Sequence, residues 1–392
     1  MRTQVGIIGG GPAGLLLALK LARSGIESIV VERRARDYVL SRIRAGVLEW
    51  GTVEQLRNAS VGARMDREGL VHDGCTIYAH GQSVHVDFRQ LVSKSVMVYG
   101  QTEITKDLYD ELDASGIQVL HDAEAVSLAG LETCSPSIGF RHRGASKCID
   151  CEFVAGCDGF YGPSRQAIPR SERREFEKIY PFGWLGLLSE TAPVSEELIY
   201  SGHERGFALC SMRNPSLSRY YLQVPLDDDA ANWSDDDFWN ELKLRLPVEA
   251  AERLETGPSI EKSIAPLRSF VTEPMSWGRL HLCGDAAHIV PPTGAKGLNL
   301  AASDVYYLHN ALRDYYRRGD LAGLESYSST ALARVWHAMR FSWWMTAMLH
   351  KFSERSNFDD RIRKSDFQYV ANSEIGRLML AENYTGLPYW RR

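Results

Sequence analysis

The sequence lacks an excess of basic residues, and it lacks an apolar run long enough to cross a membrane. Its 392 residues carry 45 Lys and Arg against 50 Asp and Glu, a formal net charge of −5. A general affinity for nucleic acid or another polyanion is therefore not expected. The apolar run at residues 341–349, rich in Trp and Met, is far shorter than the roughly 18 residues that a membrane-spanning helix needs.

The chain has seven cysteines, and their number and spacing show no sign of a disulfide framework. An odd number scattered along the sequence predicts free thiols in a reducing compartment. Cys148 and Cys151 form a CxxC, but no second CxxC or nearby His pair completes a zinc site, so we interpret them as structural thiols. The early apolar stretch is interrupted by a glycine-rich turn at residues 9–12 and by Lys20, which is unlike a secretion signal. We expect a cytoplasmic protein.

The N-terminus carries the most informative local pattern. The apolar strand Val5–Ile8 is followed by three glycines in GxGxxG spacing, a helical stretch at residues 15–22, and a second strand, Ser28–Val31, that closes in Glu32. This is the context that a dinucleotide-binding motif requires. The glycines let the backbone approach a pyrophosphate, the helix N-terminus stabilises its charge, and Glu32 can accept from a ribose hydroxyl. The glycines are Gly9, Gly11 and Gly14.

Beyond residue 180 the pattern becomes that of an antiparallel sheet. Residues 207–213 and 219–226 alternate with period two. Six aspartates between 227 and 237, with a Ser234-x-x-Asp237 pattern, predict an exposed loop that enters a capped helix rather than a metal site. Strand character returns at 279–285, a helix is expected from about Leu298, and the chain after 330 is helical and rich in Trp.

Two further motifs follow buried strands. They are Cys157-Asp158-Gly159, with Ser164-Arg165 close behind, and Gly284-Asp285-Ala286-Ala287-His288. Each could be an ordinary turn, but an Asp beside Gly after a strand can also hydrogen-bond a sugar or polyol hydroxyl. With the N-terminal unit they form the three-part pattern of FAD-dependent aromatic hydroxylases. The chain resembles this family of single-component flavoprotein monooxygenases over almost its full length, and supporting stretches are residues 38–48, 99–103, 180–184, 206–211, 264–268, 291–299 and 382–388.

The resemblance implies an α/β (α+β mixed) fold. A Rossmann-like FAD-binding domain with a βαβ unit would comprise residues 1–70, 98–180 and 268–345, and an antiparallel-sheet substrate domain would comprise 71–97 and 181–267. A C-terminal helical region, 346–392, would support a homodimer. The implied reaction is hydroxylation of 4-hydroxybenzoate at the 3-position to 3,4-dihydroxybenzoate (protocatechuate), with NADPH and O2, through a flavin hydroperoxide. Another phenolic acid such as 3-hydroxybenzoate, a non-oxygenating FAD dehydrogenase, and an inactive flavin-fold binding protein remain alternatives.

Two adjacent strands carry the candidate substrate contacts. Because side chains alternate, Ser211 and Arg213 should share a face, as should Arg219 and Tyr221. Arg beside hydroxyl donors suits a carboxylate, which it binds bidentately, although a surface salt bridge is the plainer alternative. The resemblance implies that Arg219 supports flavin positioning and that the substrate contacts are Tyr200, Ser211, Met212, Arg213, Tyr221 and Pro292.

A second set of residues would activate the substrate. Hydroxylation needs an electron-rich ring, so the substrate phenol must lose its proton. A tyrosine with a pKa of about 10 is a poor permanent base but a good relay, whereas a histidine near about 6.5 exchanges protons with water. The resemblance implies a relay of Tyr200, Tyr384 and His72, although from sequence alone each could be an ordinary packed aromatic or a surface histidine.

The flavin contacts include a rigid turn at residues 291–299 that runs into a helix. Free amides at a helix N-terminus suit an anionic reduced flavin ring. The resemblance places the Pro292 carbonyl against the substrate hydroxyl. Beyond the glycine motif and Glu32, it implies cofactor contacts at Arg42, Arg44, Ala45, Gly46, Val47, Gln101, Asp158, Arg219, Asp285, Leu298 and Asn299.

The nicotinamide cofactor is assigned to a basic stretch. Arg33, Arg34 and Tyr38 lie where the family reads the adenosine end, and their positive charge favours a 2′-phosphate, hence NADPH over NADH. Arg44 and Arg268 are further implied contacts. Tyr161 stands where well-known members carry a His, which leaves open whether Tyr161 takes over that contact.

Overall fold

A computed structural model of the chain describes residues 1–41, 46–353 and 356–389. One of its two large sheets has the order β18-β19-β12-β1-β2-β8 and is parallel except for β18. Helices α1, α6 and α9 pack together over it. The strands are β1 Val5–Ile8, β2 Ser28–Val31, β8 Val119–Leu120, β12 Phe153–Gly156, β18 Ser276–Trp277 and β19 Leu280–Leu282, and the helices are α1 Pro12–Arg23, α6 Gln101–Ala114 and α9 Gly297–Arg318.

The predicted βαβ unit is confirmed. Both strands have the bounds expected from the sequence, and they pair in parallel. Helix α1 begins three residues before the expected helical stretch, since Pro12 occupies its first turn, where a missing N–H costs nothing and the fixed φ suits a helix. Lys20 and Arg23 lie in the last turn, where positive charge is stabilising.

The second large sheet has the order β20-β17-β13-β16-β15-β14-β5-β6 and is antiparallel except where β14 meets β5. The alternating segments of the sequence form β15 and β16, which confirms them as neighbours in an antiparallel sheet. The bounds are β5 Gly74–Ala79, β6 Gln82–Asp87, β13 Arg174–Ser189, β14 Leu198–His203, β15 Gly206–Asn214, β16 Leu217–Pro225, β17 Ser259–Glu273 and β20 His288–Ile289.

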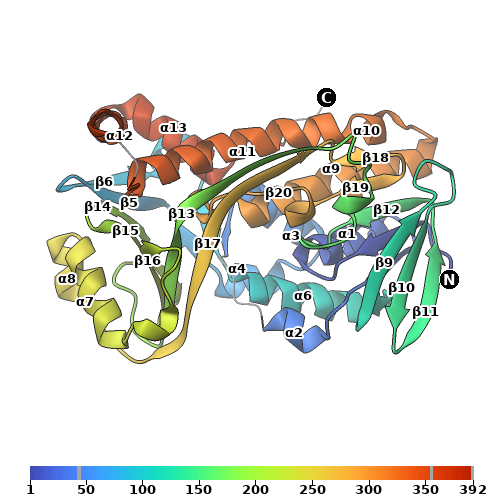
Figure 1. Ribbon diagram of the computed structural model, residues 1–392, viewed down its shortest axis with the longest axis horizontal. Coiled ribbons are helices and arrows are strands. Elements are labelled where there is room, and N and C mark those ends of the chain that lie inside the picture. The colour runs from blue at the N-terminus through green and yellow to red at the C-terminus, as the bar shows by residue number, and fades with distance from the viewer. Residues whose placement is uncertain (42–45, 354–355, 390–392) are drawn as a thin grey trace.

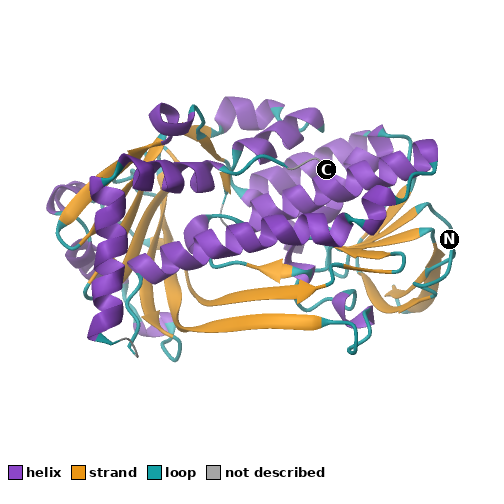
Figure 2. Ribbon diagram, turned by 90° about the horizontal axis from the view of Figure 1, so that it is seen from above, coloured by secondary structure: helices purple, strands orange, loops and turns teal. Residues whose placement is uncertain are grey.

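Strands β13 and β17 run side by side through the middle of the molecule (Figure 1). They belong to the eight-stranded sheet on the left of that view and extend toward the parallel sheet on the right, and most helices lie to one side of them (Figure 2). The domain limits expected at residues 180 and 267 therefore fall inside continuous strands rather than in loops.

The eight-stranded sheet has a different cover on each face. Helices α7 and α8 bury Phe238, Trp239 and Ala250 against one face. The other face packs against the C-terminal half of α11 and against α12 and α13. Ser234 and Asp237 form a capping box at the start of α7, so the predicted capped helix is confirmed. The helices are α7 Asp235–Arg245, α8 Val248–Arg253, α11 Tyr327–Leu349, α12 Asn357–Asn372 and α13 Glu374–Thr385.

Smaller elements complete the predicted α/β class, which is confirmed. Two three-stranded antiparallel sheets have the orders β11-β10-β9 and β3-β7-β4. All seven cysteines have free thiols, and none of the described helices is long and apolar enough to span a bilayer. The remaining elements are β3 Val47–Leu48, β4 Leu70–His72, β7 Val96–Val98, β9 Ala123–Ala129, β10 Ser137–His142, β11 Ala145–Asp150, α2 Arg36–Leu40, α3 Trp50–Asn58, α4 Ala63–Glu68, α5 Phe88–Val92 and α10 Ala322–Glu325.

Candidate active site

The glycine turn forms a cradle between β1 and α1. Gly9 has φ +108°, and a Cβ there would overlap the Cys157 carbonyl, while a Cβ at Gly14 would overlap the Gly9 carbonyl. Among the described residues, no atom outside α1 and the neighbours of Gly11 lies within 4 Å of the Cβ position at Gly11, the residue that caps α1. The cradle therefore leaves backbone amides and a helix N-terminus open to a diphosphate, which fits the pyrophosphate of FAD.

Glu32 closes this cradle from the end of β2. Its two carboxylate oxygens accept hydrogen bonds from the backbone N–H groups of Gly10, at 2.7 Å, and Arg34, at 2.8 Å. Tyr109 donates its hydroxyl to the Gly10 carbonyl at 3.1 Å. Each carboxylate oxygen can accept a second hydrogen bond, so Glu32 can hold the turn and still accept from a ribose hydroxyl.

The second and third motifs lie beside the first. Because β12 and β19 run parallel to β1, their carboxyl ends meet the glycine turn at one edge of the sheet. Asp158 Oδ2 accepts from the Ser164 N–H at 2.9 Å, whereas Oδ1 is buried and has no hydrogen-bond partner within the described ranges. Burial raises the pKa of Asp158. An orphaned buried oxygen at this edge fits a hydroxyl donor of the cofactor.

Asp285 lies in a short 3-10 helix, Gly284–Ala286, supported by a pair that sequence reasoning missed. Asp304 Oδ2 accepts from the Gly284 N–H at 2.8 Å and lies 2.7 Å from His288 Nε2. Both side chains are buried, and Asp304 raises the pKa of His288 even though burial alone would lower it. Arg165 donates to the Ala286 carbonyl at 3.2 Å and so joins the second motif to the third.

Asn299 connects the start of α9 with the segment before α3. Its Oδ1 accepts from the Glu49 N–H at 2.9 Å and the Thr52 hydroxyl at 2.8 Å. Its Nδ2 donates to the carbonyls of Val47, at 3.0 Å, and Ala295, at 2.8 Å. The predicted contacts Val47 and Asn299 are thus held together, and Leu298 lies beside them in the first turn of α9.

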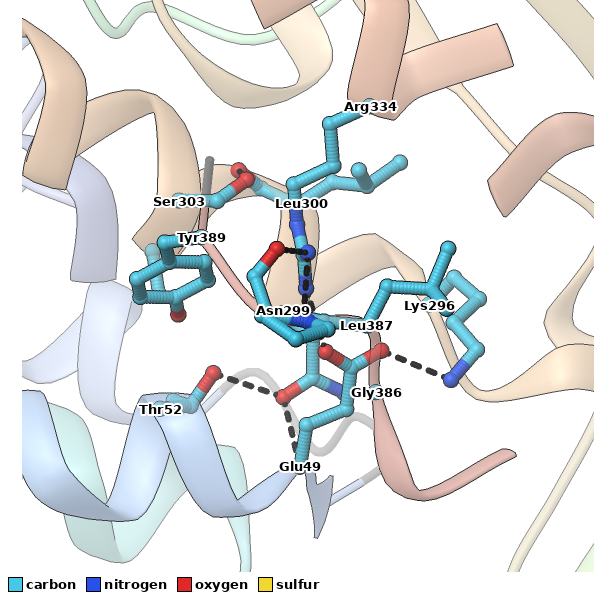
Figure 3. A network of polar contacts seen from close by, with 12 residues as sticks. Glu49, Thr52, Lys296, Asn299, Leu300, Ser303, Arg334, Gly386, Leu387 and Tyr389 are labelled. Atoms are coloured by element: carbon cyan, nitrogen blue, oxygen red, sulfur yellow. Dashed lines mark hydrogen bonds and ion pairs between the residues drawn. The ribbon is translucent and has the colours of Figure 1, made fainter. Parts of the chain in front are cut away.

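Glu49 lies between two cations in the same region, as Figure 3 shows. Its carboxylate is 2.6 Å from Lys296 Nζ and 2.6 Å from an Arg334 nitrogen, and all three side chains are about 95% buried. Burial lowers the pKa of Lys296, and the Glu49 carboxylate opposes that shift. Two cations against one carboxylate leave a net positive charge beside the turn expected to meet the flavin.

This cluster also holds the end of the chain. Lys296 Nζ donates to the Tyr384 carbonyl at 2.8 Å, and Arg334 donates to the carbonyls of Leu387, at 2.7 Å, and Pro388, at 3.4 Å. Sequence reasoning named none of Glu49, Lys296 and Arg334 as a site residue. Lys296 lay within the turn singled out at 291–299, but only the contacts show its role.

Gly46 and Gln101 lie next to each other in space. The Gly46 carbonyl accepts from the Tyr99 N–H at 2.7 Å, and Gln101 begins α6 two residues after Tyr99. Arg42, Arg44 and Ala45 lie outside the described residues.

The candidate substrate residues share one face of the eight-stranded sheet. The register places Tyr200 opposite Leu209 and Leu209 opposite Tyr221, and it places Ser211 opposite Arg219. Residues in register across antiparallel strands point to the same side, as do residues two apart along a strand. Tyr200, Ser211, Arg219 and Tyr221 therefore project toward the face covered by α11 and α13.

Arg213 lies at an irregularity of β15. The register shifts between Met212 and Asn214, so Arg213 is the extra residue of a bulge, which can re-aim a side chain out of strict alternation. Its Nε is buried and has no hydrogen-bond partner among the described residues. A buried, unpartnered guanidinium nitrogen beside Ser211 fits an anionic ligand, because leaving it unpaired is costly.

Arg219 has a partner that the sequence did not reveal. It is 3.0 Å from one Glu261 oxygen and 3.4 Å from the other, and its guanidinium lies 5.3 Å from the centre of the Tyr221 ring. Arg219 is 5% exposed. This ion pair fixes the arginine against the ring that would contact the substrate.

The hydroxyl groups of Tyr200 and Tyr384 are 2.6 Å apart. Both rings are fully buried, and burial raises the pKa of each phenol well above its usual value, so both are neutral near pH 7. His72 ends β4 and is buried, with neither ring nitrogen hydrogen-bonded within the described part of the chain. Burial lowers the pKa of His72 and the nearby Glu197, Asp73 and Glu196 oppose this.

The residues expected to contact the nicotinamide cofactor form two groups, one just after β2 and one around Phe160. Arg33, Arg34 and Tyr38 are exposed, with the Arg34 guanidinium 5.0 Å from the Tyr38 ring centre. Tyr161 is 79% exposed. Arg268 lies over the Phe160 ring at 4.6 Å and 3.4 Å from Glu177.

We expect that Glu49→Gln destabilises the protein by about 3–5 kcal/mol, because it leaves two buried cations without their carboxylate. The free energy of unfolding in urea measures this. Glu54→Gln is the control, since Glu54 lies on the exposed side of α3, the helix that directly follows Glu49, and pairs with Arg57 at 3.7 Å, and it should change stability by less than about 0.5 kcal/mol. Equal effects of the two substitutions would contradict the assignment.

Comparisons with known proteins agree with this geometry. A family model described as an FAD binding domain matches residues 2–342. The chain is 53% identical to p-hydroxybenzoate hydroxylase of Acinetobacter baylyi, over 99% of this chain and 96% of that protein. It is 26% identical to 6-hydroxy-3-succinoylpyridine 3-monooxygenase HspB of Pseudomonas putida, over 81% of each chain.

Solved structures show the same fold. The crystal structure of p-nitrophenol 4-monooxygenase PnpA from Pseudomonas putida DLL-E4 superposes with a TM-score of 0.76 at 16% identity, covering 98% of this chain and 99% of that one. The resemblance inferred from the motifs is therefore confirmed. The chain belongs to the FAD-binding family of flavoprotein aromatic hydroxylases, to which p-hydroxybenzoate hydroxylase also belongs.

Proposed function

We propose that the protein hydroxylates 4-hydroxybenzoate at the 3-position, forming 3,4-dihydroxybenzoate with NADPH and O2. The observation that carries this proposal is one sheet face with two kinds of polar group. Ser211 and Arg213, whose Nε has no hydrogen-bond partner among the described residues, lie on β15, and the Tyr200 hydroxyl, bonded to Tyr384, lies on the neighbouring strand β14. A substrate with a carboxylate and a phenol in para positions matches this pair of groups. The relative named p-hydroxybenzoate hydroxylase supports the same assignment.

The carboxylate end would be bound by Arg213 with Ser211 and Tyr221. Met212 alternates with Ser211 and so points to the opposite face, which leaves only its backbone to contribute to the pocket. Charge-assisted hydrogen bonds from a guanidinium to a carboxylate are among the stronger polar interactions. Arg219 pairs with Glu261 through its two terminal nitrogens, although its Nε, like that of Arg213, has no hydrogen-bond partner among the described residues. We assign Arg219, as the residue held by an ion pair, to positioning the flavin. This division leaves Arg213 as the carboxylate partner.

The hydroxyl end would be activated by removing its proton. Tyr200 would accept a hydrogen bond from the substrate phenol and pass its own proton to Tyr384, since the two hydroxyls are 2.6 Å apart. Because burial keeps both tyrosines neutral, they relay the proton rather than store the charge. His72 would exchange that proton with water. The Pro292 carbonyl is the proposed alternative acceptor for the single proton of the substrate hydroxyl before that proton is donated to Tyr200.

Reduced FAD, when bound, would activate O2 and supply the electrophilic oxygen atom. The residues placed to hold it are the glycine cradle with Glu32, Asp158 and Asp285 at the sheet edge, and the segment from Val47 to Asn299 joined by the Asn299 amide. Gly46, Gln101 and Leu298 are further proposed contacts, as are Arg42, Arg44 and Ala45 outside the described residues. The buried excess of positive charge at Lys296 and Arg334 would stabilise an anionic reduced ring.

NADPH is the proposed reductant. Arg33, Arg34 and Tyr38 are exposed near the end of β2, where a 2′-phosphate would meet positive charge. Arg44, Tyr161 and Arg268 are the other proposed contacts, and NADH remains an alternative reductant.

The wider organisation is also proposed. The FAD-binding part would comprise residues 1–70, 98–180 and 268–345, the substrate part 71–97 and 181–267, and the C-terminal helices would support a homodimer in the cytoplasm. Apolar side chains on α12 and α13 support such an interface, because about half or more of each is exposed in the single chain. They are Phe358, Ile362, Tyr369 and Ile375.

Product analysis tests the proposed reaction. Purified holoenzyme is incubated with NADPH and O2 and with either 4-hydroxybenzoate or 3-hydroxybenzoate, and we expect 3,4-dihydroxybenzoate from the former with one O2 consumed per product. A faster reaction with 3-hydroxybenzoate would favour the other regiochemistry. NADPH oxidation without oxygenated product would favour a dehydrogenase, and a colourless, inert protein would favour a binding protein.

We expect that Arg213→Ala raises the dissociation constant of 4-hydroxybenzoate by about 10- to 100-fold, the equivalent of one charge-assisted hydrogen-bonding partner. Calorimetric titration of the holoenzyme measures it. Arg205→Ala is the control, because Arg205 is exposed and pairs with Glu241 at 2.7 Å. An unchanged affinity in Arg213→Ala would remove this residue from the carboxylate site.

Tyr200→Phe should leave flavin reduction by NADPH largely intact while the yield of hydroxylated product per NADPH falls at least about tenfold, since proton transfer in the transition state is typically worth 10²–10⁴-fold. The oxidising equivalents would appear as hydrogen peroxide. Tyr220→Phe is the matched control, because Tyr220 is equally buried but packs against Trp239 on the opposite face of the sheet. Full product yield in Tyr200→Phe would exclude the relay.

A further inference from the structure

His350 lies where α11 ends, fully buried among aromatic rings. Trp184 Nε1 donates to His350 Nε2 at 2.8 Å. Because an indole N–H can only donate, Nε2 must accept, and the imidazole proton is on Nδ1. Nδ1 lies 3.1 Å from the Thr346 carbonyl, to which it donates. Phe182 and Phe207 stack against the ring, with centroids 4.9 and 4.2 Å away. These contacts fix the orientation and the tautomer of His350.

Through Trp184, His350 is connected by packed rings to the proposed substrate face of the eight-stranded sheet. Trp184 belongs to β13, and its ring lies 5.1 Å from the Tyr221 ring and 5.1 Å from the Phe207 ring. Tyr221 is a proposed partner of the substrate carboxylate, and Phe207 packs against Tyr200 at 6.3 Å. His350 therefore holds the indole that supports the rings around the proposed pocket.

The other side leads to the turn at residues 291–295. One turn before His350, the Thr346 hydroxyl donates to the Ser342 carbonyl at 2.7 Å, so at its 2.8 Å contact with Thr293 it must accept. Thr293 directly follows Pro292. The turn also approaches α11 so closely that a Cβ at Gly294 would lie 2.5 Å from Ser342 Oγ. The C-terminal half of α11 is thus bonded to the sheet through His350 and to the turn through Thr346.

We propose that His350 is a positioning residue that sets the distance between the two ends of the substrate pocket. The inference rests on the proposed function, in which β15 and β16 bind the carboxylate and the Pro292 turn meets the phenolic hydroxyl. A ligand with both groups must match both elements at once. Thr346 lies in the last turn of α11 and His350 directly follows that helix, so together they connect these elements without contacting the reacting atoms.

The test compares two ligands on the holoenzyme. Benzoate has only the carboxylate, so the ratio of the dissociation constants of benzoate and 4-hydroxybenzoate measures what the hydroxyl adds. In His350→Leu, which removes the acceptor for Trp184, we expect this ratio to fall by about 2- to 10-fold, the worth of one misaligned hydrogen bond. His350→Gln keeps an acceptor near the Nε2 position and should restore most of the ratio. Calorimetric titration measures both constants.

Thr346→Val is the second variant, which removes the link to Thr293 together with the bond of the hydroxyl to the Ser342 carbonyl of the same helix, and it should also lower the ratio. It keeps the inference testable if His350→Leu does not fold. His281→Leu is the matched control, because His281 is also buried, 2% exposed and next to aromatic rings, but lies in β19 of the other sheet. It should reduce thermal stability and leave the ratio unchanged.

The possible outcomes distinguish a failure of the proposed function from a failure of the positioning role of His350. A wild-type holoenzyme that does not prefer 4-hydroxybenzoate to benzoate would contradict the proposed function itself. A wild type with that preference, together with His350→Leu and Thr346→Val variants that weaken both ligands equally, would overturn the positioning role and leave His350 as a packing residue. The positioning role would be supported if the ratio is lowered in both variants and His350→Gln restores most of it.

Discussion

The candidate site depends on the buried Glu49 carboxylate, which is held between Lys296 and Arg334. These three residues come from the segment before α3, the turn before α9 and the middle of α11, and Arg334 and Lys296 also bind carbonyls near the end of the chain. Removing the Glu49 carboxylate would leave both cations uncompensated in a dry environment. The cluster therefore fixes the turn before α9, which is proposed to meet the flavin, and the Tyr384 backbone relative to each other.

The two faces of the eight-stranded sheet differ in role: one is packed against helices as apolar core, and the other carries the proposed substrate contacts. One face is covered by α7 and α8 and contains side chains such as Tyr220 and Leu222. The other carries Tyr200, Ser211 and Tyr221 toward α11 and α13. Because alternate side chains of a strand point to opposite faces, each strand can contribute to the apolar core and to the proposed pocket at once. Helix α11 contacts both the sheet and the cofactor-side turn.

Local signals in the sequence were sufficient for the βαβ unit, for β15 and β16, and for the capping box of α7. Each depends on residues a few positions apart. The bulge at Arg213 was not expected, since the alternation continues through it in the sequence. Nor was the continuity of β13 and β17 across the expected domain limits. Glu49 and Arg334, which are 285 residues apart, show no pattern that would pair them.

The sequence by itself determined the family, the FAD-binding motif and the identity of most candidate contacts, because the glycine spacing and the long matching segments are properties of the chain. Only the tertiary structure decided that Arg213 Nε has no hydrogen-bond partner among the described residues, that Arg219 pairs with Glu261, and that the end of α11 is bonded to the sheet through His350 and to the turn through Thr346. The physical reason is that burial and long-range hydrogen bonding, rather than residue type, decide which polar groups are already satisfied and which remain to bind a ligand.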